Sequence, residues 1–161
     1  MNVSDVMTKT PAYCSSDTNL GAAAEIMWNR NCGFLPIVGS QGELTGVVTD
    51  RDLCIAMATR NRLPGEITVK EVASGLTDSC KPSDDIRAAL ETMAEKKVRR
   101  LLVVNAAGKL EGILSADDVV LRTDAQARGN TGLSPDQLLQ SLRRVYGSQL
   151  RQSLQQKTAT A

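Results

Sequence analysis

Two short segments of the chain place a hydroxyl and a carboxylate at the same spacing. Thr49 stands three residues before Asp52, and Ser115 stands three residues before Asp118. This [ST]-x-x-[DE] spacing is typical of a capping box, in which each side chain hydrogen-bonds a backbone N–H of the first helical turn. Each pair follows a glycine and two apolar residues, so we expect a buried strand that leads into a helix. The free N–H groups and the dipole at such a helix N-terminus favour phosphate.

The residues needed for the commonest catalytic and metal-binding arrangements are missing. The chain has no histidine, which removes the Ser-His-Asp triad, the Cys-His dyad and the commonest general base. Its four cysteines, Cys14, Cys32, Cys54 and Cys80, form no C-x-x-C pair, so a zinc site is not expected. We interpret the cysteines as reduced, buried thiols, and the chain as a protein that is not an enzyme and holds no metal.

Composition gives no sign of a nucleic-acid or membrane partner. The net charge is +1 and the pI is about 7.6, so no strong field surrounds the protein. No apolar run approaches the roughly 20 residues of a membrane span, and the first residues lack the apolar segment of a secretory signal. We expect a cytoplasmic protein without membrane contact, for which nucleic acid is not an expected partner.

The two hydroxyl–carboxylate pairs belong to an internal repeat with an offset of 66 residues. Sliding the chain by that offset aligns the two copies without a gap. The matching pairs include Cys14 with Cys80, Met27 with Met93, and Gly46 with Gly112. Similarity of this kind indicates two copies of one supersecondary unit, neither of which is expected to bury its apolar face alone.

Each copy is predicted to fold in the order β-α-β-β-α, which gives a mixed α/β (α+β) fold with the copies in a pseudo-two-fold arrangement. In copy one, Thr18 is the expected helix cap and Gly33 the expected stop signal. Asp84 is the expected cap in copy two. The apolar stripe of the first helix is predicted to be Leu20, Ala23, Ala24 and Met27. The strands and second helices are expected at 34–38, 44–48 and 50–60, and again at 100–104, 110–114 and 116–127.

The last part of the chain carries a different pattern. Ser134 and Pro135 form a typical helix start, and apolar residues follow at Leu139, Leu142, Tyr146, Leu150 and Leu154. Such a stripe needs a surface to cover, either on its own copies or, as we favour, on a second subunit. The expected domains are therefore 1–64, 65–128 and a helical extension at 129–161.

Together, the repeat and its motifs resemble the cystathionine β-synthase (CBS) domain family, in the form of a stand-alone tandem pair known as a Bateman module. The resemblance rests on the opening segment 3–8, on the strand segment 99–104, and on the closing segments 49–52 and 115–118. It covers Val3 to about Val120. The resemblance implies a regulatory module that binds adenosine-containing ligands in clefts between paired repeats.

The family pattern also implies which polar residues contact the ligand. By this resemblance, Asp52 and Asp118 hold the ribose hydroxyls, and Thr49 and Ser115 contact phosphate or ribose. On spacing alone, both pairs remain capping boxes and nothing more. Capping and ligand binding also compete for the same side-chain atoms.

The resemblance implies basic and apolar contacts as well. Arg99 and Arg100 would meet the phosphates, because the planar guanidinium suits bidentate contacts; without the family pattern they are a solvated face. The adenine would lie against the residues of two strands and of the extended piece, which are Val47, Ile113, Thr10 and Ala12.

Copy one departs from the family pattern at the basic pair. Gly33 and Phe34 stand where copy two has Arg99 and Arg100. Copy two in turn has Leu102 where the family has proline. It also has the acidic residue Asp78 near its own cleft, at the position that matches Ala12. We therefore expect the second site to bind phosphate more strongly than the first.

The resulting hypothesis is a sensor of AMP, ADP or ATP, with S-adenosylmethionine a weaker candidate and no obligatory cofactor. The ligand would favour one arrangement of the repeats by its differential affinity, and a target protein that the sequence does not identify would respond. We expect a homodimer formed mainly through the outer faces of the helices of both repeats. The alternative is a structural, oligomerisation or protein-interaction module whose clefts bind nothing.

Overall fold

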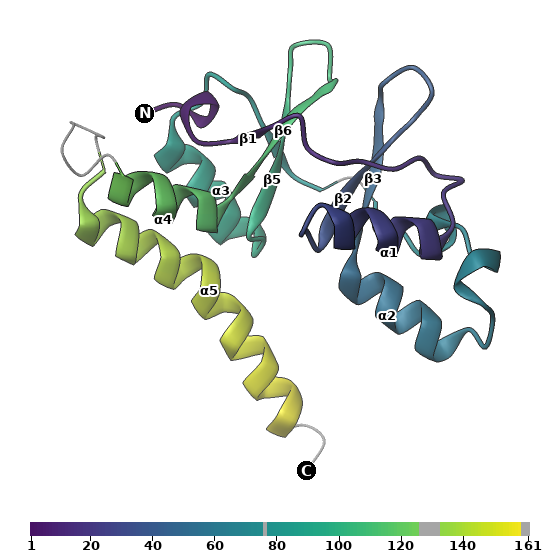
Figure 1. The fold of residues 1–161 in the computed structure, drawn as a ribbon. Coiled ribbons are helices and arrows are strands. Elements are labelled where there is room, and N and C mark those ends of the chain that lie inside the picture. The colour runs from purple at the N-terminus through teal and green to yellow at the C-terminus, as the bar shows by residue number, and fades with distance from the viewer. Residues whose placement is uncertain (76, 126–132, 159–161) are drawn as a thin grey trace. The chain divides into compact units, whose positions relative to one another are not determined.

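The computed structural model describes the backbone of residues 1–75, 77–125 and 133–158, and side chains for most of these. The chain forms two compact units, each of which is described by itself. Unit 1 comprises Met1–Lys9, Asp78–Val104 and Gly112–Ala161, and unit 2 comprises Thr10–Thr77 and Asn105–Glu111. Both units combine helices with a small sheet (Figure 1). The predicted mixed α/β fold with two repeats and a C-terminal helix is confirmed.

Unit 2 contains a two-stranded sheet and two helices. The helices are α1 (Leu20–Asn29) and α2 (Asp50–Thr59), and the antiparallel strands are β2 (Phe34–Val38) and β3 (Leu44–Thr49). Two 3-10 turns, η2 (Pro64–Glu66) and η3 (Val69–Glu71), complete the unit. Among the described residues, the core contains no aromatic side chain and consists of the buried side chains of Cys14, Leu20, Ala23, Met27, Leu35, Ile37, Val48, Leu53, Ala56, Ile67 and Val69.

Unit 1 is built around a four-stranded sheet with the order β1-β6-β5-β4 (Figure 1). Its elements, in chain order, are η1 (Val3–Asp5), β1 (Thr8–Lys9), β4 (Ser79–Cys80), α3 (Ile86–Lys96), β5 (Arg100–Val104), β6 (Leu110–Ser115), α4 (Ala116–Ala125) and α5 (Pro135–Thr158). The first two residues of β6 belong to unit 2. Strand β4 pairs parallel with β5, and β1 pairs antiparallel with β6.

The opening turn of each repeat packs on the body of the other repeat. The Val3 N–H donates to the Asp84 carbonyl at 2.9 Å in unit 1, and the Val69 N–H donates to the Thr18 carbonyl at 2.8 Å in unit 2. Val3 and Val69 are both fully buried. The exchange is therefore symmetric, and the compact units are not identical to the sequence repeats.

The predicted strands agree closely with the structure, whereas two predicted caps are wrong by one residue. The N-caps are Asn19 and Asp85, whose side chains accept the N–H groups of Ala22 and Arg87. Thr18 and Asp84 instead close the preceding turns, by accepting the N–H groups of Ser15 and Lys81. Each repeat thus has two adjacent polar residues, and the first one stabilises the turn while the second caps the helix.

The predicted stop signal of α1 is also wrong. The helix ends at Asn29 with Arg30 as its C-cap, and the next residue, Asn31, takes a left-handed conformation with φ 48°. Lys97, 66 residues after Asn31, is the C-cap of α3 and has φ 58°. Asparagine tolerates this conformation better than most residues, which is why a helix can end there without glycine.

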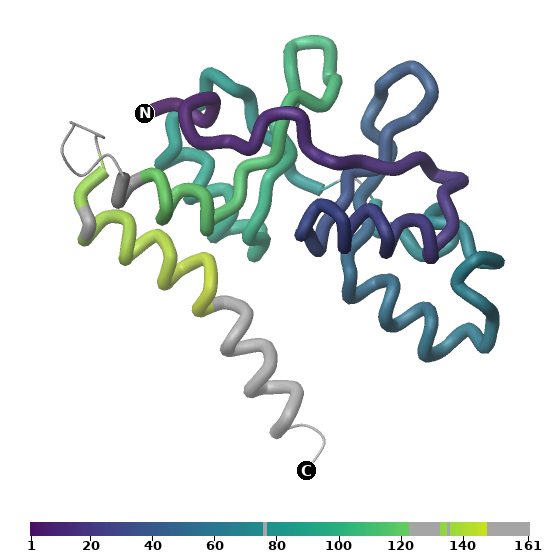
Figure 2. Tube along the Cα trace, viewed as in Figure 1, coloured from purple at the N-terminus to yellow at the C-terminus, as the bar shows by residue number. Residues whose placement is uncertain are grey.

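The described part of the C-terminal helix lies beside α3 of its own unit (Figure 1, Figure 2). Leu138 and Val145 are buried against α3, and Leu142 and Tyr146 pack beside them. Leu139, which we predicted to lie on the apolar stripe, is 48% exposed. The buried face of the helix instead contains its neighbour Leu138. Our preference for a contact with a second subunit is wrong for this part of α5. The side chains of Leu150 and Leu154 and the loop at 126–132 lie outside the described residues.

None of the described helices combines the length and the apolar character that a membrane crossing requires.

Candidate functional site

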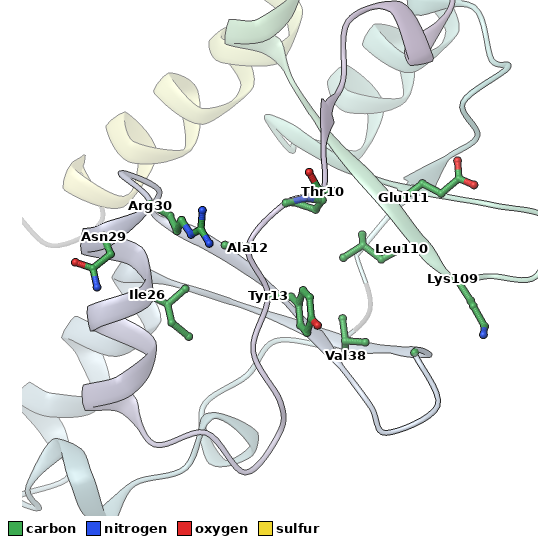
Figure 3. A pocket seen from close by; sticks show the side chains of 12 residues that line it. Thr10, Ala12, Tyr13, Ile26, Asn29, Arg30, Val38, Lys109, Leu110 and Glu111 are labelled. Atoms are coloured by element: carbon green, nitrogen blue, oxygen red, sulfur yellow. The ribbon is translucent and has the colours of Figure 1, made fainter.

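A cavity of about 930 Å³ opens in unit 2 beside the chain segment that precedes α1 (Figure 3). Its wall contains Thr10 and Ala12, the two residues that the family pattern assigns to the extended piece. The same segment also supplies Pro11 and Tyr13. The remaining lining comes from the end of α1, from the β2–β3 hairpin and from residues 109–111 around the start of β6. These residues are Ile26, Asn29, Arg30, Val38, Gly42, Lys109, Leu110 and Glu111.

The wall at 10–13 is held in an unusual conformation. Thr10 has φ 49°, a left-handed backbone that is a genuine outlier for a β-branched residue. The chain is then fixed at Cys14, whose N–H donates to the Pro36 carbonyl at 3.0 Å and whose carbonyl accepts the Val38 N–H at 2.9 Å. Burial raises the pKa of the Cys14 thiol to about 11, so it stays protonated and inert.

The cavity combines apolar walls with charged side chains at its edges. Ala12, Ile26, Val38 and Leu110 supply apolar surface, and the ring of Tyr13, which is 59% exposed, stands among them (Figure 3). Two cationic side chains, Arg30 and Lys109, and one carboxylate, Glu111, line the same cavity. An apolar site with a few charged groups suits a ligand that has a flat apolar part and an anionic part.

The hydroxyl–carboxylate pair of unit 2 forms a capping box at the start of α2. The Asp52 N–H donates to Thr49 Oγ1 at 3.2 Å, and Asp52 Oδ2 accepts both the Thr49 N–H at 2.9 Å and the Thr49 hydroxyl at 2.7 Å. The carboxylate is thus already bonded on one oxygen. Neither residue lines the cavity described above.

Unit 1 repeats this capping box with nearly the same geometry. Asp118 Oδ2 accepts the Ser115 N–H at 3.1 Å and the Ser115 hydroxyl at 2.6 Å, and the Asp118 N–H donates to Ser115 Oγ at 3.0 Å. Ser115 is only 9% exposed. The capping prediction is therefore confirmed in both repeats, while the predicted ribose contacts of both aspartates remain predictions.

The basic pair of unit 1 lies near the C-terminal helix. The Arg99 guanidinium is 6.0 Å from the ring centroid of Tyr146, a cation–π contact. The Tyr146 hydroxyl donates to Asp117 Oδ1 at 2.6 Å. Burial and this carboxylate raise the pKa of Tyr146, while the positive charges of Arg99 and Arg100 act in the opposite direction. The predicted phosphate residues thus share their surroundings with a side chain of α5.

The two residues predicted to flank adenine from the strands have different surroundings. Val47 is 5% exposed, and its backbone exchanges hydrogen bonds with Ser74 at 3.2 and 3.1 Å. Ile113 is half-buried and pairs with Thr8 in the sheet of unit 1. Of the predicted site residues, Thr10 and Ala12 thus share the wall of the cavity in unit 2. Arg99 and Arg100 in unit 1 share the surroundings of Tyr146.

Sequence reasoning missed most residues of these two places, among them Tyr13, Arg30, Lys109, Asp117 and Tyr146. Tyr13, Arg30 and Lys109 follow no motif, and their common position depends on how α1 and the 105–111 hairpin fold onto the segment 10–13. Asp117 stands inside the closing motif but has no counterpart in the family pattern we used, and Tyr146 was interpreted only as a packing residue. Among the described residues, no cluster of three or more Cys, Asp or Glu side chains is arranged to hold a metal.

Comparisons with known proteins identify the repeat. The family described as "CBS domain" matches residues 3–59 and 65–123 of the chain. In sequence, the chain is 31% identical over 133 residues to the CBS domain-containing protein YhcV of Bacillus subtilis (strain 168), and the match covers 83% of this chain and 93% of that protein.

Two solved structures have the same fold at lower identity. The CBS domain pair of protein MJ0100, in complex with 5′-methylthioadenosine and S-adenosyl-L-methionine, has a TM-score of 0.70 at 22% identity and covers 78% of this chain and 98% of that chain. The CBS domain protein PAE2072 from Pyrobaculum aerophilum, complexed with AMP, has a TM-score of 0.67 at 22% identity and covers 78% and 99%. These two proteins thus bind adenosine-containing ligands.

Proposed function

Since the chain belongs to the CBS domain family, as a tandem pair that spans most of its length, we propose that it is a regulatory module that binds an adenine nucleotide: AMP, ADP or ATP. The observation that supports this proposal is the cavity of about 930 Å³ in unit 2, whose wall includes Thr10 and Ala12. The cavity is at the large end of the roughly 300–1,000 Å³ typical of small-molecule sites. The module itself performs no catalytic step in this proposal; it responds to the ligand and a target protein reads the response.

The lining residues suggest how a nucleotide would lie in the cavity. Adenine is flat and apolar on its faces, so it would stack on the Tyr13 ring against the aliphatic wall. Arg30 would then meet the phosphates in place of the basic pair that copy one lacks at Gly33 and Phe34. Lys109 stands on the other side of the Tyr13 ring (Figure 3). S-adenosylmethionine, with a sulfonium in place of phosphate, would gain less from the Arg30 cation.

Calorimetric titration of the full chain with AMP tests this arrangement. Arg30→Gln removes one charge-assisted hydrogen bond, worth roughly 1.5–3 kcal/mol, so we expect affinity to fall about tenfold or more. Tyr13→Ala should weaken binding as well, through the loss of stacking. Arg51→Gln is the matched control, because Arg51 is an exposed residue of α2 outside the cavity. Equal affinity in wild type and Arg30→Gln would refute the phosphate assignment.

Unit 1 provides a second group of candidate ligand residues. In this part of the proposal, Arg99 and Arg100 contact phosphate, Ser115 and Asp118 contact ribose, and Ile113 contacts the base. Because the Asp118 carboxylate already accepts two hydrogen bonds from Ser115, the ligand would use its remaining acceptor positions. Arg100→Ala should weaken AMP binding clearly; if it leaves affinity unchanged, this second group has no role in binding phosphate.

A ligand-free interaction module is the second candidate function. One observation favours it: Thr49, Asp52, Ser115 and Asp118 already satisfy one another as two complete capping boxes. Titration with AMP, ATP and S-adenosylmethionine distinguishes the two functions. Absence of heat and of any shift in melting temperature with all three ligands would favour the interaction module.

The proposal also includes a homodimer formed through the outer faces of the helices. Ile55 and Met57 on α2, and Val120 and Leu121 on α4, are large apolar side chains with 40–71% of their surface exposed. Leu53 and Ala56, which face inward from α2, are buried in the core of their own unit. Light scattering at micromolar concentration tests this: a monomer would refute the dimer and leave the nucleotide site unaffected.

A further inference from the structure

The helical surface of unit 2 contains an open groove between its two helices, α1 and α2. Its volume is about 490 Å³. Met27 and Leu53 form its floor, and Trp28 and Met57 stand at its rim, with 86% and 43% of their surface exposed. An exposed tryptophan beside an open apolar groove is typical of a surface that binds a partner.

The repeat shows what such a surface accommodates. In unit 1, the positions 66 residues later than Ala24, Met27 and Leu53 are Leu90, Met93 and Val119, and all three are completely buried. They belong to one core cluster with Leu138 and Val145 of α5, and Leu142 of α5 packs against that cluster. Helix α5 lies against α3, which carries Leu90 and Met93. The surface equivalent to the groove of unit 2 is therefore occupied by an amphipathic helix of this same chain.

The helix α5 continues beyond the last residue whose side-chain contacts with unit 1 the structure describes. That residue is Tyr146, and α5 extends to Thr158. The sequence continues the four-residue spacing of Tyr146 with Leu150 and Leu154, a spacing typical of one helix face. This stretch also contains Arg151 and Lys157 and no acidic residue, while the groove is lined by the carboxylate of Asp50. Apolar spacing and charge are thus both complementary to the groove.

We propose that the groove of unit 2 is the docking site for the C-terminal half of α5 from a second copy of the chain. The helix would bury Trp28 and place a basic side chain near Asp50, in the mode of an amphipathic helix in an apolar groove. This inference rests on the proposed homodimer and not on nucleotide binding, so a failed AMP titration would leave it standing.

Trp28 makes a direct test available, because it is the only tryptophan of the chain. The fluorescence of full-length protein is measured from about 0.1 to 100 µM, alongside the mass by sedimentation. Wild type should shift to shorter emission wavelength as it dimerises. Leu150→Glu/Leu154→Glu should keep the long-wavelength emission over the whole range. Gln152→Glu/Gln156→Glu adds the same charge on the opposite side of a helix, at about 100° per residue, and should behave as wild type.

A measurement on the unmodified protein complements the variants. Cys32 lines the groove, whereas Cys54 is exposed on α2 outside the lining. Docking should lower the rate of alkylation of Cys32 at high protein concentration. This decrease should be at least several-fold larger than the decrease for Cys54. The proposal is refuted if the emission of wild type does not change with concentration. It is equally refuted if the Leu150→Glu/Leu154→Glu variant shows the full wild-type shift, since the groove is then covered by another surface.

Discussion

The helical surfaces of the two units carry residues at matching positions of the repeat, but at some of these positions the residue is packed in unit 1 and exposed in unit 2. Leu90 on α3 is completely buried, whereas Ala24, at the matching position on α1, is exposed. Ala94 is packed against the core of unit 1, whereas its counterpart Trp28 is 86% exposed. Only unit 1 has α5 among its segments. The difference follows from one added helix and not from a difference in fold.

The comparison shows that the two copies of the repeat share their backbone and core, whereas their outer surfaces make different contacts. The capping boxes, the left-handed helix ends and the buried pair Cys14 and Cys80 are the same in both units. Burial raises the pKa of each of these two thiols to about 11. What differs lies on the outside, where one surface carries α5 and the other carries a groove and an exposed tryptophan.

The largest expected effect comes from the matched positions on α1 and α3. Leu90→Ala leaves a cavity beneath α5 and should lower the free energy of unfolding by about 2–5 kcal/mol. Ala24→Leu places the same side chain in the open groove of unit 2 and should change stability by no more than about 0.5 kcal/mol. Urea denaturation followed by circular dichroism measures both. Two small and equal changes would show that α5 does not bury this surface in solution.

The capping boxes should respond equally in the two units. Thr49→Ala and Ser115→Ala each remove the hydroxyl that accepts the N–H of the third helical residue, at an expected cost of about 0.5–2 kcal/mol. Thr49→Ser and Ser115→Thr keep the hydroxyl and serve as controls. Urea denaturation measures both variants. If only one of them lowered the free energy of unfolding, the two helix starts would not be equivalent.

The regular elements were largely predictable from the sequence because they depend on local pattern. Strands β2 and β5 begin and end at the predicted residues, since each is a short apolar run between turn residues. The caps at Asn19 and Asp85 were misplaced by one residue because each follows another capping-type residue, Thr18 or Asp84. Pattern alone does not decide which of two adjacent polar side chains closes the turn and which caps the helix.

The tertiary arrangement was harder to predict from the sequence. The exchange of opening turns, in which Val3 packs in unit 1 and Val69 in unit 2, joins residues far apart in the chain. The same holds for the cavity, because Arg30 and Lys109 belong to different repeats and share no motif with Thr10. The family resemblance supplied Thr10 and Ala12, and the fold was needed for the charged residues beside them.

A smaller effect is expected from the contact between Tyr146 of α5 and Asp117 of α4. Tyr146→Phe removes the 2.6 Å hydrogen bond and should cost about 1 kcal/mol near neutral pH. The raised pKa of Tyr146 means that the bonded phenol stabilises the fold below its usual pKa of 10, and that this contribution is lost as pH rises through the higher pKa of the folded state. The difference between wild type and variant should therefore shrink in strong base.

The smallest effect concerns Glu71 in the opening turn that packs in unit 2. Its carboxylate accepts the Thr68 N–H at 2.8 Å, lies 2.8 Å from Arg62 Nη1 and accepts the Thr68 hydroxyl at 3.0 Å. These contacts, in that order, lower the pKa of Glu71 from its usual 4.5 to about 2. A lowered pKa stabilises the fold above the unfolded value, and that stabilisation is lost as pH falls through the folded one.

Glu71→Gln should therefore be less stable than wild type at pH 7 by a small margin, because the pair is exposed and screened. The margin should narrow between about pH 4.5 and pH 2, as wild type takes up the proton that the variant never binds. Thermal melts across this range at constant ionic strength measure it. Arg62→Gln removes one of the causes and should show part of the same dependence. A margin that stays constant down to pH 2 would mean that the Glu71 carboxylate is not held by these contacts in solution.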